Sequence, residues 1–272
     1  MKRILCAATA LALLGGFGAA HAQTTDWSGL YLGAHAGYSM QEDADGETVR
    51  FDTNLDGTSN DTVRTTTGAN AFSPGFCKGV SFSAVPGSCS EDDGGFEFGA
   101  RLGYDWQFGA FVVGVVGEAS RTRVKDSVTA FSTTPAFYTF TRKLDSVIAL
   151  RLRGGYAFGD NLVYATGGAA RGEVEHSFFT NNTANTFRQS DSDDANGYQV
   201  GGGFERQLTS DVTMGLEYLY TSLEDDSTVV RSMGPAPATN PFLLVNPAGT
   251  DFRRSEEDLN VHSVRVTASY RF

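Results

Sequence analysis

The sequence predicts an all-β fold, an eight-stranded antiparallel up-and-down transmembrane β-barrel. Three observations predict it: a C-terminal segment with strict alternation, seven further segments of similar pattern, and connections that are alternately short and long. In residues 264–272 apolar side chains fall on one face and polar ones on the other, the period of a β-strand. We expect this strand to pair with the first one, because a barrel in lipid can leave no open edge.

The N-terminal segment has the pattern of a secretory signal peptide. Lys2 and Arg3 precede a short apolar run, and Ala20-His21-Ala22 provides small residues at a cleavage site of the A-x-A type. We expect residues 1–22 to be removed and the barrel to occupy residues 23–272. The run is too short and too rich in glycine for a retained membrane helix.

The first four strands are predicted from aliphatic and aromatic residues that alternate with glycine and polar residues. In the second strand, for example, Phe96, Phe98 and Leu102 oppose Glu97 and Arg101. Each segment has roughly the length that a tilted membrane strand needs. The four segments are residues 30–38, 96–106, 111–120 and 144–158.

The last four strands follow the same rule with varying clarity. Residues 162–173 alternate only weakly, whereas in the seventh strand Met214, Leu216 and Tyr218 oppose Thr213 and Glu217. The four segments are residues 162–173, 198–205, 212–221 and 264–272.

The connections support a membrane barrel more than any single strand does. Three are short turns, at residues 107–110, 159–161 and about 208–211, and the long ones are residues 39–94, 124–143, 176–194 and 224–259. Short periplasmic turns that alternate with long extracellular loops are typical of outer-membrane barrels. A soluble lipocalin-type barrel is the competing interpretation. Such a barrel keeps its apolar face inside, whereas one face here mixes charges of both signs.

Aromatic residues cluster near the predicted strand ends, where a girdle at the membrane interfaces is expected. A ring-stacking sugar site is the alternative. The residues are Trp27, Tyr38, Trp106, Phe108, Tyr156, Phe158 and Tyr220.

Charge and cysteine content limit the functional classes. The formal net charge is −11, which argues against nucleic-acid binding. Cys6 leaves with the signal peptide, so Cys77 and Cys89 form an even pair in an oxidising compartment and are predicted to be disulfide-bonded.

Several short motifs together resemble a known family. They are Trp27-Ser28-Gly29-Leu30-Tyr31-Leu32-Gly33, Gly103-Tyr104-Asp105-Trp106-Gln107, Arg153-Gly154-Gly155-Tyr156-Ala157-Phe158, Glu217-Tyr218-Leu219-Tyr220 and Tyr270-Arg271-Phe272. In this order they resemble the small porin-like outer-membrane β-barrel proteins of alphaproteobacteria, related in architecture to OmpA and OmpX. The resemblance implies a location in the Gram-negative outer membrane. It also implies that Tyr270 and Phe272 form an assembly signal for the barrel-assembly machinery.

The polar face of the predicted strands carries charges of both signs that should point into the lumen. One interpretation is a pore lined for selectivity. The other, which we favour, is a salt-bridged plug, because an eight-stranded barrel is barely wide enough for its own side chains and buried charges must be paired. The predicted lumen residues are Glu97, Arg101, Glu118, Arg151, Arg153, Arg171, Glu173, Glu205, Glu217, Arg265 and Arg271.

No set of residues predicts an enzyme, a cofactor or a metal site. The segment Asp52-x-Asn54-x-Asp56-Gly57 resembles the front of a calcium loop, but its twelfth position is Val63 instead of glutamate. The sequence therefore predicts a structural or surface-interacting protein that anchors long acidic extracellular loops in lipid. These loops would contact an extracellular ligand or host surface. A narrow porin that passes small solutes or ions is the alternative.

Overall fold

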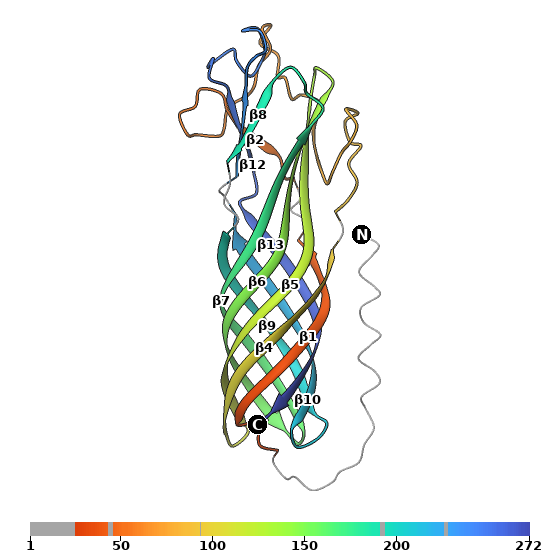
Figure 1. Cartoon of the computed structure of the whole chain (residues 1–272), viewed down its shortest axis with the longest axis vertical. Helices are drawn as coiled ribbons and strands as arrows, with labels where there is room; N and C mark the ends of the chain where they lie inside the picture. The colour runs from red at the N-terminus through yellow and green to blue at the C-terminus, as the bar shows by residue number, and fades with distance from the viewer. Residues whose placement is uncertain (1–24, 43–45, 93, 191–193, 226–227) are drawn as a thin grey trace.

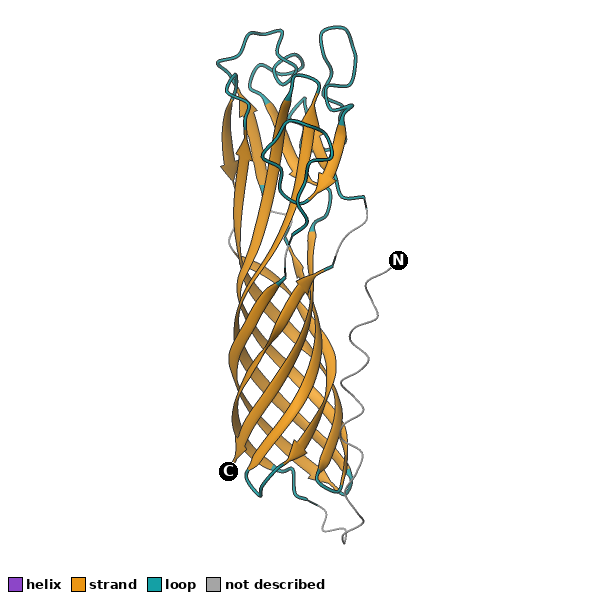
Figure 2. Ribbon diagram, turned by 90° about the vertical axis from the view of Figure 1, so that its right-hand side faces the viewer, coloured by secondary structure: helices purple, strands orange, loops and turns teal. Residues whose placement is uncertain are grey.

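The computed structural model describes residues 25–42, 46–92, 94–190, 194–225 and 228–272. The predicted signal peptide, residues 1–22, lies outside the described residues. Within the described part the regular structure is β-strand (Figure 2). None of these residues belongs to a helix long and apolar enough to cross a membrane.

Eight long strands close into a ring, which confirms the predicted fold class (Figure 1). β1 pairs with β4 on one side and with β13 on the other, and every barrel pairing is antiparallel. The ring strands are β1 (Gly29–Gln41), β4 (Gly95–Phe108), β5 (Phe111–Ser132), β6 (Ala136–Phe158), β7 (Asn161–Thr180), β9 (Asp194–Gln207), β10 (Val212–Glu224) and β13 (Asp258–Arg271).

Tight turns connect the strands at the end of the barrel where the C-terminus lies (Figure 1). Gly109 joins β4 to β5 and Gly159 joins β6 to β7, and both have a positive φ that favours glycine. These are two of the three short turns that the sequence predicts.

Burial alternates along the barrel strands as the sequence pattern predicts. The outward face is apolar and exposed, with Phe96 at 81% and Leu152 at 70%, and it forms the surface that lipid covers. Tyr38, Trp106, Phe108, Tyr156 and Phe158 point outward near the strand ends, as in an aromatic girdle. Trp27 differs, because its ring is fully buried with Val112, Ala157, Leu162 and Tyr164 at the turn end of the lumen.

The long connections contain more regular structure than predicted. The prediction of a long loop at residues 124–143 is largely wrong, because β5 continues to Ser132 and β6 begins at Ala136. The physical reason is that this hairpin has buried side chains on both faces. Val128 and Tyr138 belong to an apolar core, and Thr129 and Thr139 are covered as well.

The three other long connections contribute short strands, most of which join into a second sheet at the far end from the turns (Figure 1). Its strand order is β2 (Val49–Asp52), β12 (Thr250–Arg254), β11 (Val229–Met233) and β8 (Thr186–Ser190). β3 (Gly75–Lys78) instead pairs with the distal part of β5. We call this end of the molecule the head: β2, β3, β8, β11, β12, the described connections beside them, and the distal hairpin of β5 and β6.

The head has an aromatic core of its own. Phe252 is fully buried and its ring lies within 5.2 Å of the ring centroids of Phe51 and Phe242. Phe72 and Tyr138 complete the same cluster, with centroids 5.4 Å apart. A disulfide joins Cys77 in β3 to Cys89. The long connections therefore fold together instead of forming separate loops.

Candidate functional site: the barrel lumen

A guanidinium group occupies the centre of the lumen. Arg265 on β13 donates hydrogen bonds to carboxylates from three other strands: Glu97 on β4 at 2.9 Å, Glu118 on β5 at 2.5 Å and Glu217 on β10 at 2.8 Å. Strand alternation directs all four side chains inward, and each residue is at most 6% exposed. One cation thus connects its own strand to three others of the ring.

Neighbouring polar groups complete this central cluster. Arg151 donates to Glu118 at 2.9 Å, and the Tyr164 hydroxyl donates to Glu217 at 2.9 Å. The Ser39 hydroxyl donates to Glu97 at 2.5 Å. The carboxylates are therefore paired or hydrogen-bonded, which buried charges require.

A second ionic cluster lies closer to the turn end. Asp105 pairs with Arg153 at 2.8 Å and with Arg271 at 3.0 Å. Glu205 accepts from Arg153 at 3.1 Å and is also paired with Arg101. The two clusters together contain five arginines and five carboxylates, so their charges balance. The members are Arg101, Arg151, Arg153, Arg265 and Arg271 with Glu97, Asp105, Glu118, Glu205 and Glu217.

Nine of the eleven predicted lumen residues are buried inside the ring. The prediction is wrong for Arg171 and Glu173, which are exposed on the outer face of β7. Arg171 forms a surface ion pair with Asp194, and Glu173 accepts from the Ser146 hydroxyl at 3.1 Å. Tyr164 and Val174 point inward, so the even-numbered residues of β7 face the lumen. Because side chains alternate along a strand, the odd-numbered residues point outward. Both lie toward the head-side rim, where Glu173 is opposite Ser146 of β6 and Asp194 of β9.

Sequence reasoning missed Asp105 and His35, which are both buried in the lumen. Asp105 lies on the same face of its strand as Glu97 and Arg101, so the alternation itself could have identified it. His35 lies 3.5 Å from Glu97 and 3.0 Å from the Ser120 hydroxyl.

Apolar layers lie on both sides of the ionic clusters. Along β5 the inward residues change from Val112 at the turn end, through Glu118, to Val124. Val124 packs with Leu144, Leu223 and other buried residues in a layer between the central cluster and the head. The lumen therefore contains apolar, ionic and apolar layers in succession.

A further ionic junction joins the barrel to the head. Arg254 on β12 donates to both oxygens of Glu47, at 2.7 and 2.9 Å, and to Asp126 at 2.8 Å. Arg142 donates to the same Asp126 at 2.7 Å. Burial raises the pKa of the Glu47 carboxyl, although Arg254 opposes the shift.

Two groups of residues could suggest a metal site. His35, Glu97 and Glu118 place their ligand atoms within 4.8 Å of one another. Arg265 already bonds both carboxylates, so its guanidinium supplies the positive charge there. The calcium-like segment has a different role, because Asp52 accepts from the backbone NH groups of Leu55 and Gly57 and so closes a turn.

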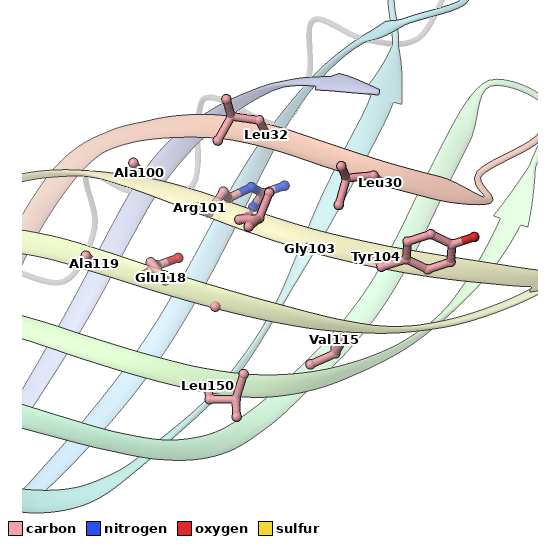
Figure 3. Close-up of a pocket in the computed structure, with 12 residues that line it drawn as sticks. Leu30, Leu32, Ala100, Arg101, Gly103, Tyr104, Val115, Glu118, Ala119 and Leu150 are labelled. Carbon is pink, nitrogen blue, oxygen red and sulfur yellow. The ribbon is translucent and has the colours of Figure 1, made fainter. Parts of the chain in front are cut away.

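A shallow hollow is present on the outer face of the barrel (Figure 3). Leu30, Leu32, Leu102 and Leu150 surround it where small residues such as Gly117 leave space. The hollow is apolar and belongs to the lipid-covered surface. Arg101 and Glu118 come from the same strands, but their side chains are buried.

Comparison with known proteins decides the family. The family model described as "Outer membrane protein beta-barrel domain" matches residues 9–272, which is nearly the whole chain. The chain belongs to this family. Its members' location places the protein in the outer membrane of a Gram-negative cell, as predicted.

Curated relatives of this outer-membrane barrel include the "31 kDa outer-membrane immunogenic protein" of Brucella melitensis and that of Brucella suis. Each is 27% identical over 256 residues, which cover 93% of this chain and 87% of the relative.

Solved barrels give weaker matches. OprG of Pseudomonas aeruginosa is 14% identical with a TM-score of 0.46 and covers 90% of this chain and 97% of its own. The protease OmpT of Escherichia coli is 11% identical with a TM-score of 0.42 and covers the same shares.

Proposed function

We propose that the barrel is a closed membrane anchor that presents the head outside the cell. The observation that carries this proposal is the balanced set of five arginines and five carboxylates across the lumen. The interior of an eight-stranded barrel is so narrow that its own side chains can fill it. Ion pairs that connect opposite strands in such a lumen hold it shut.

The head supports the second half of the proposal. The end with long connections is extracellular in barrels of this kind. An aromatic core and a disulfide give this end a fixed shape, which suits recognition of an external surface better than separate disordered loops do.

A narrow porin remains the alternative function. It requires a continuous polar path, whereas this lumen has apolar layers at Val112 and Val124 on either side of the ionic clusters. The same apolar layers also argue against slow passage of sugars through the lumen.

Solute flux through liposomes tests the proposal. Liposomes that contain the purified, folded protein should swell in arabinose no faster than protein-free liposomes. Liposomes with a general porin provide the positive control. A swelling rate that rises with the amount of this protein would contradict the closed anchor.

The C-terminal residue provides a test of assembly. Tyr270 and Phe272 are exposed on the outer face at the end of β13, with ring centroids 5.0 Å apart. We infer that the barrel-assembly machinery binds this aromatic end. Phe272→Asp should then reduce the outer-membrane level several-fold without blocking export, and Phe272→Tyr should not. Equal levels of the Asp variant and wild type in outer-membrane fractions would refute the inference.

A further inference from the structure

The outer face of the four-stranded head sheet carries two arginine pairs at directly opposite positions. Arg231 on β11 lies opposite Arg188 on β8, and Arg253 on β12 lies opposite Arg50 on β2. Like charges at directly opposite positions on one sheet face destabilise the sheet. Asp251 and Asp52 lie on the same face and offset the repulsion at Arg231.

Strand alternation places all four arginines on the same face. Phe51, Phe252 and Val230 occupy the intervening positions and point into the aromatic core, so their neighbours point away from it. Arg50 and Arg188 are exposed, and Arg231 and Arg253 are half-buried. We call Arg50, Arg188, Arg231 and Arg253 the arginine face.

Most guanidinium groups of the arginine face are free to bind a ligand. Arg50, Arg188 and Arg253 have no ion-pair partner among the described residues. Arg231 is held by Asp251, which accepts from its Nε at 2.6 Å and from its Nη2 at 2.7 Å. This contact fixes the orientation of Arg231 and leaves Nη1 available.

A groove runs over the same part of the sheet. Its lining consists of Arg188, Arg231, Ser190, Val229 and Met233, together with Asp251, whose carboxylate is bonded to Arg231. Opposite side chains on adjacent strands are about 5 Å apart and diagonal ones about 7–8 Å. Anionic groups at such intervals along a chain could contact several guanidinium groups at once.

We propose that the arginine face binds an anionic glycan that carries sulfate or phosphate esters. The planar guanidinium group matches two oxygens of such an ester, and the hydroxyl and apolar lining of the groove suits sugar rings. The sheet lies at the end of the molecule far from the lipid-covered band (Figure 1), which favours a glycan over a lipid headgroup. This inference rests on the proposed function, because it names what the presented head recognises.

Binding of dextran sulfate to the full chain in lipid nanodiscs tests the proposal, with unsulfated dextran as the matched probe. The protein should bind dextran sulfate and not dextran, and sodium chloride should weaken the binding. Two further probes test other ligands. Vesicles of phosphatidylglycerol test a lipid headgroup, and single-stranded DNA in solution tests nucleic acid. Binding of either of these as tightly as dextran sulfate would overturn the glycan assignment.

A double variant tests the residues. Arg188→Gln/Arg253→Gln removes one member of each like-charged pair and keeps the Arg231–Asp251 pair, so the head should remain folded. We expect about tenfold weaker binding of dextran sulfate, because two charge-assisted contacts are lost. The control Arg121→Gln/Arg123→Gln removes two exposed arginines at the head-side rim of β5 and should bind like wild type.

Equal affinities of the two double variants would overturn the proposal, provided that unboiled samples migrate alike. Its failure is separate from failure of the closed anchor. Solute flux through the lumen would leave binding at the arginine face unchanged, and loss of binding would leave the lumen closed.

Discussion

Replacing Arg265 by methionine should lower the free energy of unfolding of the barrel by about 3–5 kcal/mol. Arg265 is the shared partner of Glu97, Glu118 and Glu217, and its side chain is fully buried. The substitution keeps similar volume but leaves three carboxylates close together, with Arg151 as their remaining arginine partner among the described residues. Urea unfolding in lipid vesicles, followed by tryptophan fluorescence, measures the change.

Two further variants separate charge from packing in this experiment. Arg171→Met makes the same substitution in the exposed ion pair with Asp194, and we expect little change there. Arg265→Met/Glu118→Gln also removes one of the three carboxylates that lose Arg265, and it should recover part of the lost free energy of unfolding. If Arg265→Met were as stable as Arg171→Met, the ionic clusters would not hold the barrel together.

Replacing Phe252 by alanine should open the head while the barrel stays folded. Its ring contacts Phe51, Phe242 and Tyr138 with centroids 5.0 to 5.7 Å apart, and truncation of such a core ring costs about 3–5 kcal/mol. Trypsin should then cleave the head about a hundredfold faster or more, since cleavage follows the population of the open form.

Phe82→Ala is the matched control for the head. The Phe82 ring is also in the head, but it is 79% exposed, so its removal leaves no cavity. We expect trypsin cleavage at the wild-type rate and no change in the heat-dependent gel shift of either variant. Equal cleavage rates for Phe252→Ala and Phe82→Ala would show that the head has no cooperative core.

The barrel was predictable because lipid imposes one simple rule on every strand. Each outward residue must be apolar, so Phe96, Phe98 and Leu102 identify both the strand and its inward face. The inward charges follow by elimination, as for Glu97 and Arg101. The rule fails at the rim, where lipid ends, and for that reason the sequence wrongly predicts that the exposed residues Arg171 and Glu173 face the lumen.

The head was not predictable from local patterns, because its strands are short and pair across long sequence distances. β2 pairs with β12, about two hundred residues further along the chain. Four residues such as Val49–Asp52 cannot by themselves establish a strand. The ion-pair partners of Arg265 were not predictable from local patterns either, because they meet only when the barrel closes. The alternation predicts that the charges point inward, whereas only the register shows that Glu97, Glu118 and Glu217 meet at one guanidinium group.

Ion current across a planar bilayer tests the closed lumen most directly, because ions are smaller than any sugar used in swelling. Folded wild-type protein should give no reproducible conductance steps above the bare bilayer, on the same membranes where a general porin gives large ones. Frequent, uniform steps from the wild-type protein would contradict a lumen closed by paired arginines and carboxylates.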